Sequence, residues 1–223
     1  IKNLIMKKIL LSIFTVSILG SGISQAVSDR NTIPVAVNLN RVLRMSVNTG
    51  GNIEFTFNTI AQYKNGISGD LASSGSAGTA AANPMYITSF TIAASTKWRL
   101  DYGAEDATFI GVDNPANIGL TLDNVGFSLA STGTHAFGTE LASIPTNAGA
   151  EVAALQAYPV VLLTDGGNAA ANAGDATDNA FTMTWRCGTA EGTGTPMNTD
   201  KLIEQGLAPD RYVTNVLFNL IAL

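Results

Sequence analysis

The sequence predicts an all-β protein, an antiparallel β-sandwich of the Ig-like or jelly-roll-like kind with long loops rich in Gly, Ala and Asn. Apolar and polar residues alternate in short runs, which is the period of a half-buried strand. Clusters of Gly, Asn and Asp separate these runs, and the chain has no long amphipathic helical pattern. We therefore expect eight to ten strands in one domain, residues 27–223, because sandwiches of this length commonly fold as one unit.

Residues 1–26 have the layout of a secretory signal peptide. Translation is expected to start at Met6, where two lysines precede the apolar run Ile9–Gly20. Small residues, Ser24 and Ala26, stand where a signal peptidase would cut, so export and cleavage after Ala26 are predicted. The alternative is a membrane anchor, but this apolar run is shorter than the roughly 20 residues that span a bilayer.

The first strands are predicted at residues 33–39, 43–47 and 53–57. Strand 33–39 alternates cleanly, and its apolar face consists of Ile33, Val35, Val37 and Leu39. Pro34 cannot donate to a ladder, so the start of this strand belongs at a sheet edge. The turn residues 48–51 predict that 43–47 and 53–57 form a hairpin. A second turn is expected at residues 63–66, followed by a long exposed loop through residue 83.

The middle of the chain predicts several short strands. They are expected at residues 86–93, 97–102, 108–112, 119–122 and 126–129. Trp98 is large enough to centre the core of a sandwich. Residues 151–156 could form one or two helical turns, and the apolar run 158–164 has the length of a central strand.

The last third contains a loop, a strand, a short helix and a long final strand. They are predicted at residues 165–179, 181–185, 199–205 and 212–223, with Thr199 capping the helix. The final strand is apolar on both faces. One face carries Val213, Leu217 and Ile221, so it must be covered by the protein itself or lie at a subunit contact.

Charge and cysteine content narrow the classes of partner. The formal net charge of −5 becomes −8 once the three lysines of residues 1–26 are removed. An acidic chain argues against nucleic acid and against anionic membrane surfaces, and no membrane span is expected in the mature chain. The single cysteine, Cys187, cannot form an internal disulfide. A free thiol or a bridge between molecules is possible, but its place at the end of the apolar run Phe181–Cys187 favours burial.

No catalytic, cofactor or metal site is predicted, and the chain is not expected to be an enzyme. His135 is the only histidine and lies in a loop-like context, and no acid pair forms a recognisable glycosidase motif. The Asp-rich loops 101–113 and 165–178 offer oxygen ligands of the kind that calcium prefers, although ordinary turn chemistry explains their composition. Trp98 and Trp185 could stack on sugars, but both lie in strand patterns where core packing is favoured.

Four segments together carry a family resemblance. They are Ile53–Thr59, Tyr63–Ile67, Lys97–Leu100 and Tyr212–Leu223. They resemble exported Ig-like β-sandwich proteins of the fimbrial or spore-coat-like kind, including surface proteins of Bacteroidota. The resemblance implies a subunit of an extracellular fibre or coat, in which an extension of one subunit completes the sheet of the next. The chain departs from that pattern in lacking a disulfide and in having a short leader, Val27–Thr32.

We therefore expect a secreted structural subunit of an extracellular or cell-surface filament, assembled by strand complementation between copies. Strand 33–39 would be the donor strand, although pairing within its own sheet is the competing interpretation. The alternative function is a secreted adhesin or carbohydrate-binding module, with a surface glycan or a cell-envelope protein as its partner.

Overall fold

The computed structural model describes residues 33–69, 84–143, 152–167, 172–191 and 195–223. The predicted signal peptide, the leader and most of loop 66–83 lie outside these residues. The chain divides into two compact units, Ile1–Leu39 and Asn40–Leu223. The strands all belong to the second unit.

Two antiparallel sheets form this unit. The larger sheet has the order β1-β3-β10-β6-β8, with β2 beside β10. Its strands are β1 (Leu43–Thr49), β2 (Ile67–Ser68), β3 (Ile87–Ala94), β6 (Val125–Ser131), β8 (Val152–Ala154) and β10 (Gly174–Cys187). The second sheet has the order β12-β4-β9-β7. Its strands are β4 (Trp98–Ala104), β7 (Leu141–Ser143), β9 (Val160–Asp165) and β12 (Val216–Ala222).

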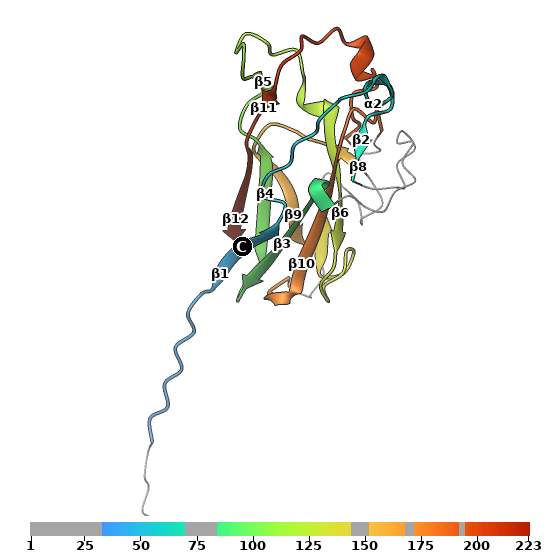
Figure 1. The fold of residues 1–223 in the computed structure, drawn as a ribbon. Helices are drawn as coiled ribbons and strands as arrows, with labels where there is room; N and C mark the ends of the chain where they lie inside the picture. Colours follow the sequence, from blue (N-terminus) through green and yellow to red (C-terminus); the bar gives the residue numbers. More distant parts are fainter. Residues whose placement is uncertain (1–32, 70–83, 144–151, 168–171, 192–194) are drawn as a thin grey trace, which may run out of the picture. The chain divides into compact units, whose positions relative to one another are not determined.

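Short elements lie between the strands of the two sheets along the chain (Figure 1). Strands β5 (Ile110–Gly111) and β11 (Tyr212–Val213) pair with each other. The helical elements are α2 (Ile60–Asn65) and the 3₁₀ turns η1 (Pro84–Tyr86), η2 (Leu122–Asn124) and η3 (Leu202–Glu204).

The core lies between the two sheets. Strand β3 alternates half-buried and fully buried residues along its whole length, which is the pattern that its sequence predicts. Aromatic pairs join the sheets: Trp98 meets Phe181 edge-on, and Tyr102 meets Phe127 in the same way. The predicted fold class, an all-β antiparallel sandwich, is confirmed.

Strands β1 and β12 are the edge strands of their sheets and lie beside each other. Leu43, at the start of β1, pairs with Ala94, and the Leu223 amide donates to the Lys97 carbonyl across the β3–β4 turn. The chain therefore enters and leaves the sandwich at the same end, which we call the base. Strand β1 runs away from the base, and β12 runs towards it.

Several predicted elements are wrong. Residues 53–57 form no ladder, and β1 pairs with β3 instead. Residues 119–122 form no strand either, since they lead into η2. The segment 151–156, where helical turns were expected, contains strand β8 at Val152–Ala154, because pairing with β6 outweighs the helix propensity of its alanines; residue 151 lies outside the described residues.

Helix boundaries also differ from the prediction. The helix expected at 199–205 is a single 3₁₀ turn that follows Lys201, so Thr199 caps nothing. The predicted turn 63–66 is the end of α2, whose start is fixed by a capping box between Thr59 and Gln62. The loop expected up to residue 179 ends early, because β10 already begins at Gly174.

Among the residues that the structure describes, no helix has the length and apolar character needed to cross a bilayer.

Candidate functional site: an open groove at the sandwich edge

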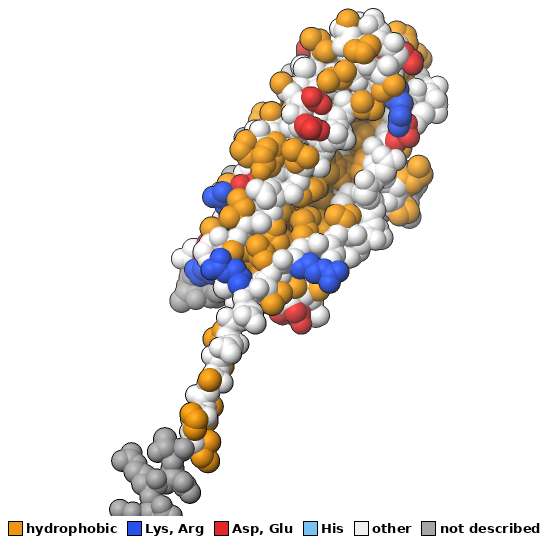
Figure 2. Space-filling model, turned by 90° about the vertical axis from the view of Figure 1, so that its left-hand side faces the viewer, with side chains coloured by type: hydrophobic (Ala, Val, Ile, Leu, Met, Phe, Trp, Pro, Cys, Tyr) orange, Lys and Arg blue, Asp and Glu red, His pale blue; other side chains and the backbone are white. Residues whose placement is uncertain are grey.

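A groove of about 840 Å³ opens along the edge of the sandwich where β1 and β12 diverge. One wall is residues 51–57, which we call the flap, and the other is residues 211–218, which we call the C-terminal wall. Figure 2 shows hydrophobic side chains lining a hollow that runs along this face of the molecule.

The groove exposes the inside of the sandwich. Its floor includes Trp185, Cys187 and Leu155, which are core side chains. Half-buried apolar side chains project from both walls and pack against that core; they are Ile53, Phe55, Phe57, Val216 and Phe218. A sandwich whose edge was closed by another strand would bury these side chains more fully.

The flap has the side-chain pattern of a strand without its hydrogen bonds. Ile53, Phe55 and Phe57 are half-buried, whereas the residues between them are exposed. This period of two indicates an extended backbone. Among the described residues, none makes a backbone–backbone hydrogen bond to Gly51–Phe57. The predicted hairpin is wrong because β1, its expected partner, pairs with β3 instead.

Both ends of the flap are fixed. At one end, the Thr88 hydroxyl donates to the Gly50 carbonyl, and the left-handed φ of Gly50, 67°, turns the chain out of the sheet. At the other end, the side chain of Gln62 accepts from the backbone amides of Asn58 and Thr59. The flap is therefore an extended span held at its two ends.

The C-terminal wall presents an open strand edge to the groove. In the described chain β12 pairs only with β4, and the Glu105 amide donates to the Asn215 carbonyl in that ladder. Backbone groups of an antiparallel strand alternate in direction, so odd-numbered residues of β12 face β4. The N–H and C=O groups of Val216 and Phe218 consequently point away from β4, where a further strand could bind them.

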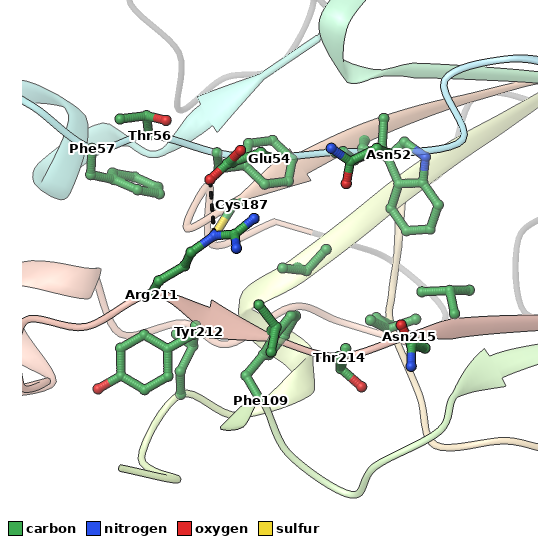
Figure 3. A pocket seen from close by; sticks show the side chains of 18 of the residues that line it. Asn52, Glu54, Thr56, Phe57, Phe109, Cys187, Arg211, Tyr212, Thr214 and Asn215 are labelled. Carbon is green, nitrogen blue, oxygen red and sulfur yellow. Dashed lines mark hydrogen bonds and ion pairs between the residues drawn. The ribbon is translucent and has the colours of Figure 1, made fainter. Parts of the chain in front are cut away.

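One ion pair crosses the groove between the two walls. Arg211 Nε lies 3.2 Å from Glu54 Oε1, and Figure 3 shows the two side chains reaching towards each other over Cys187. Both side chains are more than half exposed, at 61% and 53%. Water therefore screens this pair strongly.

Asp210 fixes the position of Arg211. Its carboxylate accepts from the backbone amides of Asp113, Asn114 and Arg211 and from the side-chain amide of Asn117. These hydrogen bonds, beginning with that from Asp113, hold the pKa of Asp210 below its usual range. The Val112 amide also donates to the Arg211 carbonyl. The C-terminal wall is thus rigidly held where Arg211 stands.

Cys187 lies on the groove floor and carries a protonated thiol. It is a free cysteine and buried, as the sequence predicted. Burial raises the pKa of its thiol to about 12, which keeps the thiol protonated at neutral pH. Its contribution to the groove is apolar surface.

The structure leaves the predicted donor segment in solvent. We call residues 33–39 the tail; they form no strand. The exposed fractions of Ile33, Val35, Val37 and Leu39 are 82%, 83%, 75% and 91%. Whether this segment pairs within its own molecule or with a second copy stays a prediction.

The predicted residues of the last strand lie mostly outside the groove. Val213 contributes to the groove lining and is exposed. Leu217 and Ile221 lie on the outer face of β12, and Leu217 is exposed there. Val216 and Phe218 line the groove instead. The sequence did contain a signal for the flap, the alternation of Ile53 to Phe57, but it indicated a paired strand.

Other candidate sites lose support. Trp98 and Trp185 are 0% and 5% exposed, so they pack in the core and offer no surface to a sugar. His135 is half-buried, and its Nδ1 lies 3.0 Å from the Asn179 side-chain oxygen. In the described part of the chain, no group of three His, Cys, Asp or Glu residues is arranged to hold a metal ion.

Comparison with models of known protein families and with curated protein sequences finds no match for this chain. Its function is therefore inferred from the geometry of the groove and from the tail.

Proposed function

We propose that this chain is a structural subunit of an extracellular or cell-surface filament, in which the tail of one copy completes the open groove of the next. The layout of residues 1–26 as a signal peptide supports the extracellular location. The observation that carries the proposal is the coexistence of an unfilled apolar groove and an exposed, alternating apolar segment in one chain.

The lengths of the two parts agree. An extended strand advances about 3.3 Å per residue, so the seven residues of the tail span roughly 23 Å. The flap also has seven residues and is extended, so a strand lying beside it along its whole length would have the same span. One tail therefore matches one groove.

The chemistry of the two parts also agrees. The apolar face of the tail would enter the groove, while Pro34, Ala36 and Asn38 on its other face stay towards solvent. Burying four such apolar side chains contributes about 6–12 kcal/mol before the cost of ordering the tail. The outward backbone groups of Val216 and Phe218 would pair with the backbone of the tail and fix its register.

The direction in which the tail enters the groove decides between a filament and a closed dimer. Every tail continues into β1 and so leaves its own sandwich at the base. If it enters the neighbouring groove from the end remote from that neighbour's base, it runs antiparallel to β12. This contact is head-to-tail and does not close on itself, so it continues as a filament. Entry from the base end would run parallel to β12 and would let two copies exchange tails as a closed pair.

Disulfide cross-linking tests both the exchange and its direction. The chain from residue 27, with Cys187→Ala, would carry either Asn38→Cys with Val213→Cys or Pro34→Cys with Val213→Cys. Antiparallel entry should cross-link the Asn38 pair between molecules and produce ladders of covalent oligomers on a denaturing gel. Parallel entry should cross-link the Pro34 pair instead.

Electron microscopy of the same chain at rising concentration supplies the second readout. Fibres should form from the chain that begins at residue 27 and disappear when residues 27–40 are deleted. Fibre formation that persists without these residues, or the absence of intermolecular cross-links from both pairs, would show that the tail does not join the subunits.

A further inference from the structure

We propose that the flap is a movable gate, which the Glu54–Arg211 ion pair holds over the groove in the free subunit and which opens to admit an incoming strand. This inference rests on the proposed function, because it concerns how the same groove is filled.

Of the two walls of the groove, the flap is the one able to move. From Gly51 to Phe57 the flap makes no backbone–backbone hydrogen bond to any residue that the structure describes, whereas both of its ends are fixed. The opposite wall is immobilised at Arg211 by Asp210 and by the pairing with Val112. An opening motion therefore requires displacement of the flap alone, with the hinges at Gly50 and Asn58.

The Glu54–Arg211 ion pair lies where an incoming strand would have to pass. Glu54 projects from the middle of the flap, away from the core-facing Ile53 and Phe55, and reaches Arg211 across the groove mouth. In the described chain, Glu54–Arg211 is the one ion pair that connects the two walls. For a strand to fit between them, the flap and the C-terminal wall must be about two interstrand spacings apart, roughly 9.5 Å. The side chains of Glu54 and Arg211 bridge this gap, so they lie over the path of that strand.

The ion pair is weak enough to break when a strand enters. An exposed ion pair of this kind changes an equilibrium only a few-fold and weakens as salt is added. On the inner side of the flap, Phe55 stacks on Tyr86 with ring centroids 4.8 Å apart. This contact positions the flap in its closed state. The entering tail would replace the ion pair with backbone hydrogen bonds to the groove walls.

The test measures how fast a single strand enters the groove. The host is the chain from residue 27 with Val37→Asp, which weakens competition from its own tail. The probe is a fluorescent, end-capped peptide of residues 32–40, which contains no charged side chain. Its association rate is followed by stopped-flow anisotropy at low and high salt.

We expect Glu54→Gln and Arg211→Gln each to raise the association rate at low salt by roughly two- to five-fold. The two substitutions change the net charge in opposite directions, so long-range steering cannot explain an increase in both. Salt should accelerate the parent and leave both variants nearly unchanged. The exchanged pair Glu54→Arg with Arg211→Glu should restore the parent rate.

The matched control is Asp165→Asn, which removes the ion pair between Asp165 and Lys97 away from the groove and should not alter the rate. Equal rates in the parent and both groove variants would overturn the gate. So would a change confined to the dissociation rate, since the pair would then hold the bound strand in place. If the peptide binds no variant and cross-links are also absent, the proposed function itself is wrong.

Discussion

At the scale of single residues, Asn172 supplies hydrogen-bond partners to Trp98, the buried first residue of β4. Trp98 opens β4, and its backbone groups point away from β12 at a position that β9 does not reach. The Asn172 side chain accepts from the Trp98 amide and donates to the Trp98 carbonyl. The Trp98 indole N–H in turn donates to the Asn172 carbonyl. One asparagine therefore satisfies the buried polar groups beside the largest core side chain.

Replacing Asn172 with Ala should lower the free energy of unfolding by about 2–6 kcal/mol. The substitution leaves the amide and the carbonyl of Trp98 buried without a partner, and each such group costs about 1–3 kcal/mol. Urea unfolding followed by tryptophan fluorescence measures the change. Asn219→Ala, on an exposed residue, should stay within about 0.5 kcal/mol. An Asn172→Ala variant as stable as this control would contradict the assigned role.

At the scale of elements, the flap is directed by the glycine that precedes it. Gly50 has a left-handed backbone, and a Cβ atom there would lie 2.0 Å from the Ile87 carbonyl oxygen. Its neighbour Gly51 has open space at the same position. The turn from β1 into the flap therefore depends on the first glycine only.

The two glycines give a matched pair of variants. Gly50→Ala should destabilise the fold by about 2–4 kcal/mol, because the left-handed conformation and the clash with the β3 backbone both oppose a side chain. Gly51→Ala should change stability by less than about 0.5 kcal/mol. Thermal and urea unfolding of both variants would decide the matter, and equal stabilities would show that Gly50 does not set the path of the flap.

At the scale of the whole molecule, each chain offers an apolar surface and a place to bury one. The tail is extended and exposed, and the groove leaves core side chains half-buried. In the proposed assembly with antiparallel entry, each copy would satisfy these two features through two different neighbours. Such an arrangement favours open-ended assembly.

Val37→Asp and Asn38→Asp separate the two faces of the tail with the same added charge. Val37→Asp should abolish assembly, because a carboxylate cannot enter the apolar groove without a large desolvation cost. Asn38→Asp should assemble like the parent, since that residue stays in solvent. Sedimentation velocity at increasing concentration reports the result, and unfolding curves of the two monomers should coincide. Assembly by Val37→Asp at the parental level would exclude burial of this face.

The sequence by itself determined the class of fold and most of the core. Alternation in β3 and β10, and the large aromatic residues Trp98 and Trp185, specify which faces are buried, because a strand has one periodicity whatever its partners are. The same alternation identified the tail as a strand-like segment. It could not say which strands pair, since pairing depends on residues far apart in the chain.

Only the tertiary structure decided where a strand is missing. Residues 53–57 have a strand pattern as clear as that of β3, yet no residue that the structure describes pairs with their backbone. Hydrogen bonding across a sheet is a property of two segments together, and one segment cannot encode whether its partner is present. The groove, the open edge of β12 and the Glu54–Arg211 contact all depend on this missing pairing, which no periodicity in the chain could have revealed.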